Sequence, residues 1–350
     1  MTQISNSYFI LFKKLFFFIV LSQFIHLPSK AQEGKYQNLV FEGAGIRGIA
    51  YAGVLEELET RNILNHIRRV GGTSAGAITA LAVSLGYRSN EIRDIIYHTN
   101  FESFNDGGFS FIGGFIRMKN KFGCYKGNKF TSWLEKIISR KTGNKNITFK
   151  ELHDQGYKDL YITATCLNQQ KVIIFSYHNY PQMKVKDAVR ISMSIPLYFK
   201  AVFIDSAGNI IHKTKNRNNL DIMIDGGLVA NFPITMFDSS VIDSNNQPLR
   251  LPNNQTIGIR IDTENQIQLD KLNGGLEPYP IQTFKQYLEA SYVYILESLN
   301  RQTLTQADWS RTISVSSADI SPILKKLSPQ QKNRLIQNGR MAVKYYLKSD

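Results

Sequence analysis

Two glycine-rich turns, each placed between an apolar run and a helical stretch, constrain the fold of this chain more than any other feature. The apolar runs are short enough for strands, and the stretches after the turns carry apolar residues at helical spacing. In order, the predicted strand, loop, helix, strand, turn and helix lie at residues 37–41, 43–48, 49–61, 67–70, 72–76 and 77–85. Strands that alternate with helices favour an α/β fold with a mainly parallel central sheet covered on both faces, a three-layer α/β/α arrangement.

Further apolar runs extend this pattern toward the middle of the chain. They predict strands at residues 160–167, 172–176, 220–224 and 256–260. Two polar segments, 205–219 and 238–255, predict surface loops or hairpins. The α/β domain is therefore expected to cover residues 36–262.

Beyond residue 262 the pattern changes to two long amphipathic stretches separated by polar linkers. The stretches at 281–299 and 329–347 predict helices, and neither contains a strand or a motif of its own. We therefore expect residues 263–350 to form a helical extension that packs on the same domain.

The first 31 residues have the pattern of a secretory signal peptide. Lys13 and Lys14 precede the apolar run 15–27, and Ser29-Lys30-Ala31 gives a small-x-small cleavage pattern. The run is shorter than the roughly 20 residues that span a bilayer. The mature protein is expected to be secreted or to lie in the periplasm or cell envelope, and the alternative is a membrane anchor formed by residues 15–27.

The chain of 350 residues is basic, with 42 Lys and Arg against 28 Asp and Glu and a net charge of +14. Because the excess is spread along the chain, it favours phosphates and anionic surfaces in general, including an anionic membrane. No RNP, zinc-finger or recognition-helix pattern accompanies it, so nucleic-acid binding is not predicted. The two cysteines, Cys124 and Cys166, have no metal-ligand spacing, so no metal site is predicted and their pairing is left open.

The first turn, Gly43-Ala44-Gly45-Ile46-Arg47-Gly48, is a GxGxxG motif between a strand and a helix. The spacing fits a dinucleotide-binding turn, a loop that stabilises an oxyanion or a phosphate, or a structural tight turn. A dinucleotide site also needs an acidic residue at the end of the second strand, where this chain has Arg68-Arg69-Val70. The loop alone leaves these interpretations open.

The second turn, Gly72-Thr73-Ser74-Ala75-Gly76, is a GxSxG motif at a strand-to-helix junction. In that context the motif predicts a nucleophile elbow, with Ser74 on a strained turn and Gly72 and Gly76 allowing close approach of strand and helix. The helix would also aim its first N–H groups at the reaction centre. The other interpretation of Ser74 is a simple helix cap.

A nucleophilic serine needs a base, and none of the six histidines lies in a motif that marks one. Asp225-Gly226-Gly227 ends a predicted strand, where α/β sheets collect catalytic groups. Its apolar neighbours Ile224 and Leu228 would desolvate the carboxylate and raise its pKa. Asp106-Gly107-Gly108 repeats the tripeptide with no strand before it and predicts a turn.

The order GxGxRG, GTSAG and then DGG followed by Asn-x-Pro resembles the patatin-like phospholipases, serine acyl hydrolases that use a Ser-Asp dyad. The similarity runs from residue 37 to 262 and includes the segments 124–127, 130–138, 162–165 and 187–196. It implies a catalytic domain at 36–262. Within it, the resemblance implies Ser74 as nucleophile, Asp225 as base, Gly226 and Gly227 as the rest of the DGG motif, and residues 43–48 as the oxyanion hole.

The resemblance also implies an activity, the hydrolysis of carboxylic esters of membrane lipids in the manner of a phospholipase A or lysophospholipase, without a cofactor. Ala44 departs from the glycine that many relatives carry, yet its backbone N–H can still donate to an oxyanion. Two alternatives remain, a nucleotide-binding module that uses the GxGxxG loop and a non-catalytic lipid-binding protein. The oligomeric state is not predicted.

Two features near the predicted site have two interpretations each. The segment 101–122 is rich in Phe and Gly and contains Arg117, Lys119 and Lys121, which suits either a mobile lid that contacts an anionic bilayer or a buried cap. Arg47 either adds positive charge near the loop or a phosphate headgroup, or faces solvent at the start of a helix.

Overall fold

The structure is a computed structural model that describes residues 34–107, 118, 122–212, 217–272, 275–301, 304–322 and 326–349. The predicted signal peptide at 1–31 and most of the segment 101–122 lie outside the described residues. Tyr36–Asp350 forms one compact unit.

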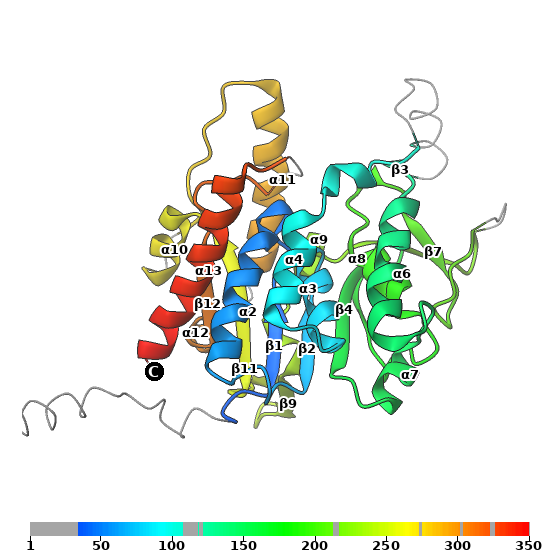
Figure 1. Cartoon of the computed structure of the whole chain (residues 1–350), viewed down its shortest axis with the longest axis horizontal. Helices are drawn as coiled ribbons and strands as arrows, with labels where there is room; N and C mark the ends of the chain where they lie inside the picture. Colours follow the sequence, from blue (N-terminus) through cyan, green and yellow to red (C-terminus); the bar gives the residue numbers. More distant parts are fainter. Residues whose placement is uncertain are drawn as a thin grey trace, which may run out of the picture. The chain divides into compact units, whose positions relative to one another are not determined.

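A mainly parallel sheet lies at the centre of this unit (Figure 1). In sheet order its strands are β12 (Thr312–Ser316), β11 (Thr256–Asp262), β1 (Asn38–Phe41), β2 (Arg69–Gly72), β4 (Asp159–Cys166), β8 (Asp221–Asp225) and β7 (Val202–Ile204). The strands from β12 to β4 run parallel, whereas β8 and β7 continue the sheet antiparallel. β5 (Lys171–Phe175) also pairs antiparallel with β4. The predicted mainly parallel sheet is confirmed.

Helices flank the sheet and connect its strands. They are α2 (Ala50–Thr60), α3 (Ala75–Ser84), α4 (Ser89–His98), α6 (Asn128–Thr142), α7 (Phe149–Asp154), α8 (Val185–Ser192), α9 (Gly227–Ala230), α10 (Glu264–Lys271), α11 (Phe284–Arg301), α12 (Gln306–Ser310) and α13 (Pro329–Ser349). Short 3-10 helices within the described ranges are η2 (Gly45–Ile49), η3 (Phe101–Phe104) and η4 (Ile234–Phe237). α3 packs on β1, β2 and β4, while α13 lies along α2 (Figure 1).

Both faces of the sheet are buried, as β1 illustrates. Leu39 and Phe41 belong to the main core under the helices, whereas Val40 packs with Tyr161 and Phe237 on the opposite face. Successive side chains of a strand point to opposite faces, so an uninterrupted apolar run fits a strand covered on both sides.

The C-terminal part contributes more than the predicted helices, because β12 lies between them. It pairs with β11 from Gly258↔Thr312 to Asp262↔Ser316 and extends the central sheet by one strand. The run Thr312–Ser316 alternates small polar with apolar side chains, so it lacks the continuous apolar run from which the other strands were predicted.

Short pairings outside the sheet account for the remaining strands. β9 (Ser239–Ile242) and β10 (Pro248–Leu251) form an antiparallel hairpin within the predicted loop or hairpin 238–255, and β3 (Gly123–Tyr125) pairs with β6 (Leu197–Phe199). Over the part of the chain that the structure describes, no helix has the length and apolar composition to cross a membrane. Cys124 and Cys166 are not joined by a disulfide.

Candidate active site

Ser74 occupies a strained turn between β2 and α3, as a nucleophile elbow requires. Its φ of 54° and ψ of −119° are unfavourable for a residue with a side chain. A Cβ at Gly72 would lie 2.5 Å from the backbone of Gly76, and a Cβ at Gly76 would lie 2.4 Å from the Phe41 carbonyl oxygen. Glycine is therefore required on both sides of the serine, because only backbone without a side chain fits there.

Neighbouring hydroxyl groups fix the backbone of the elbow. The Ser74 N–H donates to Ser192 Oγ at 2.9 Å, and Thr73 Oγ1 donates to the Ala230 carbonyl oxygen at 2.7 Å. Thr73 also shares a short hydrogen bond with Thr163 of β4. These contacts tie the turn to β4, α8 and α9, so the strained conformation is maintained by tertiary structure.

Strand register brings Asp225 to the elbow. β4 pairs with β2 at Ile162↔Gly72 and with β8 at Ala164↔Asp225. Because Ser74 follows Gly72 by two residues, it lies level with Ala164 and therefore with Asp225 on the far side of β4. β8 is antiparallel to its neighbour, so Asp225 reaches the site by this register rather than by sharing the carboxyl edge of parallel strands.

The Asp225 carboxylate is buried, and among the described residues its hydrogen-bond donors are the Gly227 N–H and the Ser74 hydroxyl. Oδ1 accepts the Gly227 N–H at 2.7 Å. Burial raises the pKa of Asp225 from 3.8 to about 7, although the hydrogen bonds from the Gly227 N–H and the Ser74 hydroxyl act to lower it. At neutral pH this carboxylate is poised between its two protonation states.

The Ser74 hydroxyl is within reach of two acceptors. Its Oγ lies 3.3 Å from Met193 Sδ, and the hydrogen bond from the same hydroxyl is one of the interactions that lower the pKa of Asp225. The thioether is a weaker acceptor than a carboxylate, so Asp225 is the stronger of the two acceptors for the hydroxyl proton. The serine and the aspartate predicted from the sequence are thus brought together.

The glycine-rich loop packs against the elbow, but half of its six amides are already used. The N–H of Gly43 donates to the Asn231 carbonyl at 2.9 Å, that of Ile46 to Pro322 at 3.2 Å and that of Arg47 to Ala44 at 3.1 Å. The loop then enters η2, so it lacks the row of available N–H groups that a dinucleotide pyrophosphate needs.

Two amides facing the cavity are candidates for holding an oxyanion. Gly45 begins η2 and Ala75 begins α3, and neither N–H has a backbone or side-chain acceptor among the described residues. A Cβ at Gly48, near the end of η2, would lie 3.1 Å from the Ala75 Cβ, so η2 packs against the start of α3. Both point the positive end of a helix toward the site.

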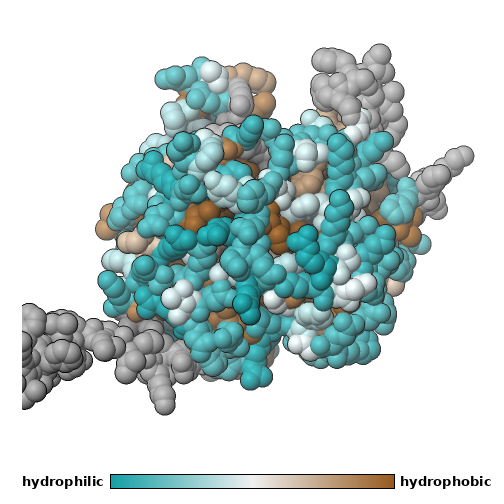
Figure 2. Space-filling view, viewed as in Figure 1, coloured by the Kyte–Doolittle hydropathy of each residue, from teal (hydrophilic) through white to brown (hydrophobic). Residues whose placement is uncertain are grey.

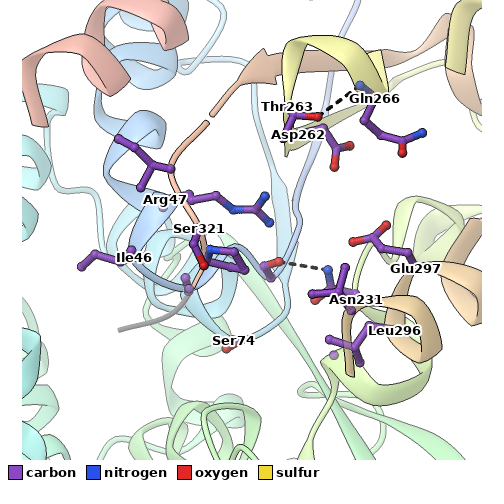
Figure 3. Close-up of a pocket in the computed structure, with 18 of the residues that line it drawn as sticks. Ile46, Arg47, Ser74, Asn231, Asp262, Thr263, Gln266, Leu296, Glu297 and Ser321 are labelled. Carbon is purple, nitrogen blue, oxygen red and sulfur yellow. Dashed lines mark hydrogen bonds between the residues drawn. The ribbon is translucent and has the colours of Figure 1, made fainter. Parts of the chain in front are cut away.

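Arg47 lies inside the protein rather than facing solvent. Its side chain is 9% exposed, lines the cavity and donates from Nε to the Ala44 carbonyl oxygen at 3.3 Å. The interpretation of Arg47 as a solvent-facing residue is therefore wrong, and the structure places its positive charge beside the loop (Figure 3).

Two asparagines connect the loop to the Asp-Gly-Gly turn. Asn231 Nδ2 donates to the Gly43 carbonyl at 2.9 Å (Figure 3), while its own N–H donates to Asn300 Oδ1. Asn300 Nδ2 donates in turn to the Gly227 carbonyl at 3.3 Å. Asn231 belongs to the Asn-x-Pro motif noted in the sequence. Asn300 has no local signal, because its partners lie about 70 residues earlier in the chain.

A buried charge cluster forms the polar end of the site, where α11 meets β11. Arg260 is fully buried and pairs with Asp262 and Glu297, both at 2.6 Å, and Arg301 pairs with Asp262 at 3.0 Å. Burial acts to raise the pKa of Asp262, but the two guanidinium groups outweigh it and lower the pKa to about 2. Glu42 lies in the same cluster, and burial raises its pKa. The cluster anchors the C-terminal half of α11 to the sheet.

The elbow, the glycine loop and part of the charge cluster line one cavity of about 1020 Å³ (Figure 3). Ser74, Asp225, Gly45, Arg47 and Ala75 all line it. Apolar side chains from several elements form much of the remaining wall, among them Ile46, Ile78, Ile96, Phe101, Met193, Ile195, Leu276, Ile281, Val293, Leu296 and Ile320. The cavity can therefore hold a long apolar group with a polar end at the serine.

Other candidate residues lie away from this cavity. None of the histidines within the described ranges lines it. Asp106 is buried, but its oxygens accept the N–H groups of Gly127, Asn128 and Lys129 at 2.6, 2.6 and 3.0 Å. It caps the N-terminus of α6, consistent with its predicted structural role. Groups of side chains able to hold a metal ion are absent from the described ranges.

The fold and site define an α/β protein with a serine elbow, a buried carboxylate and a glycine loop around an apolar cavity. Residues 39–238 match the patatin-like phospholipase family, and the chain belongs to that family. Membership of this family supports lipid hydrolase activity.

Individual proteins agree with this assignment. The chain is 30% identical to the uncharacterised protein R571 of Acanthamoeba polyphaga mimivirus, over 91% of this chain and 95% of R571. It is 29% identical to the probable lipid hydrolase 463L of Invertebrate iridescent virus 6, over 57% of this chain and 62% of that protein. Among solved structures, VipD from Legionella pneumophila shares the fold with a TM-score of 0.54 and 15% identity, covering 90% of this chain and 67% of VipD.

Proposed function

We propose that this protein hydrolyses carboxylic esters of membrane lipids, with Ser74 as the nucleophile and Asp225 as the general base. The observation that carries the proposal is the buried Asp225, whose pKa is raised to about 7, next to a serine on a strained elbow. A base with a pKa near the working pH combines a sufficient unprotonated fraction with a useful affinity for the proton.

The reaction would proceed through an acyl-enzyme. Asp225 accepts the hydroxyl proton while Ser74 Oγ bonds to the ester carbonyl carbon, and the carbonyl oxygen becomes an oxyanion. As the bond to the leaving alkoxide breaks, Asp225 gives that proton to it. Water then attacks the acyl carbon and gives a proton to Asp225, and the bond to Ser74 breaks. Ser74 regains the proton and the fatty acid leaves.

The N–H groups of Gly45 and Ala75 are the proposed oxyanion donors. Both line the cavity with Ser74 and lack an acceptor among the described residues, whereas the amides of Gly43, Ile46 and Arg47 donate elsewhere. Loss of one oxyanion donor in other hydrolases costs about 2.7–4 kcal/mol of transition-state stabilisation. Of the six loop residues predicted to form the oxyanion hole, the proposal therefore uses the N–H of Gly45, together with the N–H of Ala75 at the start of α3.

The proposed substrates are phospholipids or lysophospholipids. The apolar walls of the cavity of about 1020 Å³ suit an acyl chain. Arg47 lines the same cavity as Ser74, and its positive charge could bind a lipid phosphate there. We further propose that residues 1–31 direct the protein to the cell envelope or outside the cell, where it meets anionic membranes.

Product analysis tests this function. The purified mature chain, the matched variant Ser74→Ala and buffer alone are incubated with mixed phospholipid, lysophospholipid and neutral-lipid vesicles, and fatty acids and lyso products are measured by mass spectrometry. Release of fatty acid from phospholipid or lysophospholipid by the wild type alone would support the proposal. Equal release by Ser74→Ala, or lipid binding without any release, would refute it in favour of another nucleophile or a non-catalytic lipid-binding protein.

A further inference from the structure

α11 carries two apolar faces, which is unusual for a helix on the surface of a globular protein. One face, with Tyr287, Ala290 and Tyr294, lines the cavity. The other face is formed by residues that do not line the cavity, and these are Phe284, Leu288, Ile295 and Leu299, exposed by 76, 52, 50 and 46% respectively. Their spacing of four, seven and four residues places them in one stripe along the helix.

The outward stripe runs along almost the whole of α11, and the first turns of this helix project from the rest of the unit. Figure 1 shows the segment 275–283 and the first turns of α11 rising beyond the sheet, and Figure 2 shows apolar side chains on this projection. The other end of the helix is fixed in the interior by Glu297, Asn300 and Arg301 through the charge cluster and the Gly227 carbonyl. The helix is therefore anchored at its C-terminal end and presents its N-terminal half to the surroundings.

The exposed apolar surface continues directly into the cavity. Tyr279, Ile281, Tyr287 and Tyr294 line the cavity and are also exposed by 40, 53, 56 and 66%. Tyrosine and aliphatic side chains together suit the boundary between water and the acyl region of a lipid layer. The 18-residue α11 is too polar to cross a membrane, so it would lie on such a surface.

We propose that the stripe of Phe284, Leu288, Ile295 and Leu299 docks on the surface of a lipid bilayer and sets the cavity mouth against it. This inference rests on the proposed function, because a lipid hydrolase must take its substrate from such a surface. A lipid molecule could then enter the cavity along Tyr287 and Tyr294 without crossing water. The four stripe side chains carry no charge, so docking would depend mainly on apolar burial.

The test compares two triple variants of the mature chain that remove similar exposed apolar surface. Phe284→Ser/Leu288→Ser/Ile295→Ser alters the stripe. Val241→Ser/Ile242→Ser/Leu249→Ser alters the hairpin β9–β10, where these side chains are exposed by 44, 64 and 52% and do not line the cavity. Co-sedimentation with phosphatidylcholine vesicles measures binding, and hydrolysis of a water-soluble short-chain ester measures the catalytic site without a lipid surface.

The stripe variant should lose vesicle binding by about tenfold or more, since three large apolar side chains no longer leave water. Its turnover of the soluble ester should remain within about twofold of wild type, and the hairpin variant should match wild type in both assays. Wild-type vesicle binding in the stripe variant, or equal loss in the hairpin variant, would overturn the proposal. A dimer that dissociates in the stripe variant while vesicle binding persists would instead assign the stripe to a second copy of this chain. Failure of the wild type to hydrolyse the short-chain ester would refute the proposed function, and the vesicle-binding comparison would then test the docking proposal by itself.

Discussion

Two Asp-Gly-Gly tripeptides in this chain have opposite fates. Asp106 follows the 3-10 helix η3 and not a strand, and its carboxylate accepts three backbone N–H groups at the start of α6. Asp225 ends β8, accepts one backbone N–H and lies next to the Ser74 hydroxyl with a pKa raised to about 7. Both carboxylates are buried. Burial alone therefore does not distinguish the two carboxylates. They differ in the number and kind of hydrogen-bond donors that surround them.

The largest difference is expected in catalysis. Ser74→Ala removes the only atom that can form the acyl-enzyme, and Asp225→Asn removes the proton acceptor, so each should lower kcat/KM for a lipid ester by about 10³-fold or more. Asp106→Asn should leave the activity of the folded enzyme within about threefold of wild type. Initial rates, with circular dichroism to establish folding, check all three variants.

The pH dependence of stability should separate the two aspartates next. The pKa of Asp225 is raised from 3.8 to about 7, so the folded state binds the extra proton between these values. Its contribution to the free energy of unfolding is then largest below about pH 4 and falls as pH rises to about 7. Asp225→Asn removes this loss and should stabilise the protein relative to wild type by up to about 4 kcal/mol above pH 7.

Urea unfolding of wild type and Asp225→Asn at pH 5 and pH 8 measures this effect. The stability gain of the variant should be greater at pH 8 than at pH 5. A gain of equal size at the two pH values would mean that the carboxyl group does not titrate in this range in the folded protein.

The hydrogen bonds from Asn300 that hold the second tripeptide in place can be removed without changing Ser74 or Asp225. Asn300→Ala leaves the Gly227 carbonyl and the Asn231 N–H without their partner, which should cost about 1–3 kcal/mol of stability. Because Asn231 also holds the glycine loop, kcat should fall by about tenfold while KM changes little. Steady-state kinetics would contradict this role if kcat stayed at the wild-type value while stability fell.

The smallest effect is expected at the first tripeptide. Asp106→Asn replaces a charged helix cap by a neutral one that can accept fewer of the three N–H groups, so thermal or urea unfolding should show a loss of about 1 kcal/mol. Asp106→Glu is the matched control that retains the charge but lengthens the side chain. A loss of activity in the correctly folded Asp106→Asn protein would end the distinction between the two motifs.

The elbow could be predicted from the sequence because its requirements are local. The apolar run, the two glycines and the following helix all lie within a few residues of Ser74, and the same applies to the strand before Asp225. The sequence did not indicate that β8 is antiparallel, so the expected reason for the position of Asp225 was different from the one found. Register with Ala164 of β4 places it level with the serine.

The rest of the site depends on contacts between distant segments, which no local pattern reports. Asn300 and Pro322 join the C-terminal region to residues of the catalytic motifs, and the pairing of Arg260 with Glu297 joins it to β11. The same limit applies to Arg47, whose two interpretations differ only in which tertiary neighbours surround it. β12 was not predicted because its polar residues made the segment resemble the polar linkers around it.

Reaction with a fluorophosphonate probe tests the central pairing of Ser74 and Asp225 most directly. Intact-mass and peptide mass spectrometry should find one label, on Ser74, with a rate that rises with pH through about 7 as Asp225 loses its proton. The rate should fall by orders of magnitude in Asp225→Asn and remain at the wild-type value in Asp106→Asn. Labelling of a different residue, or of Ser74 at an undiminished rate in Asp225→Asn, would contradict the account.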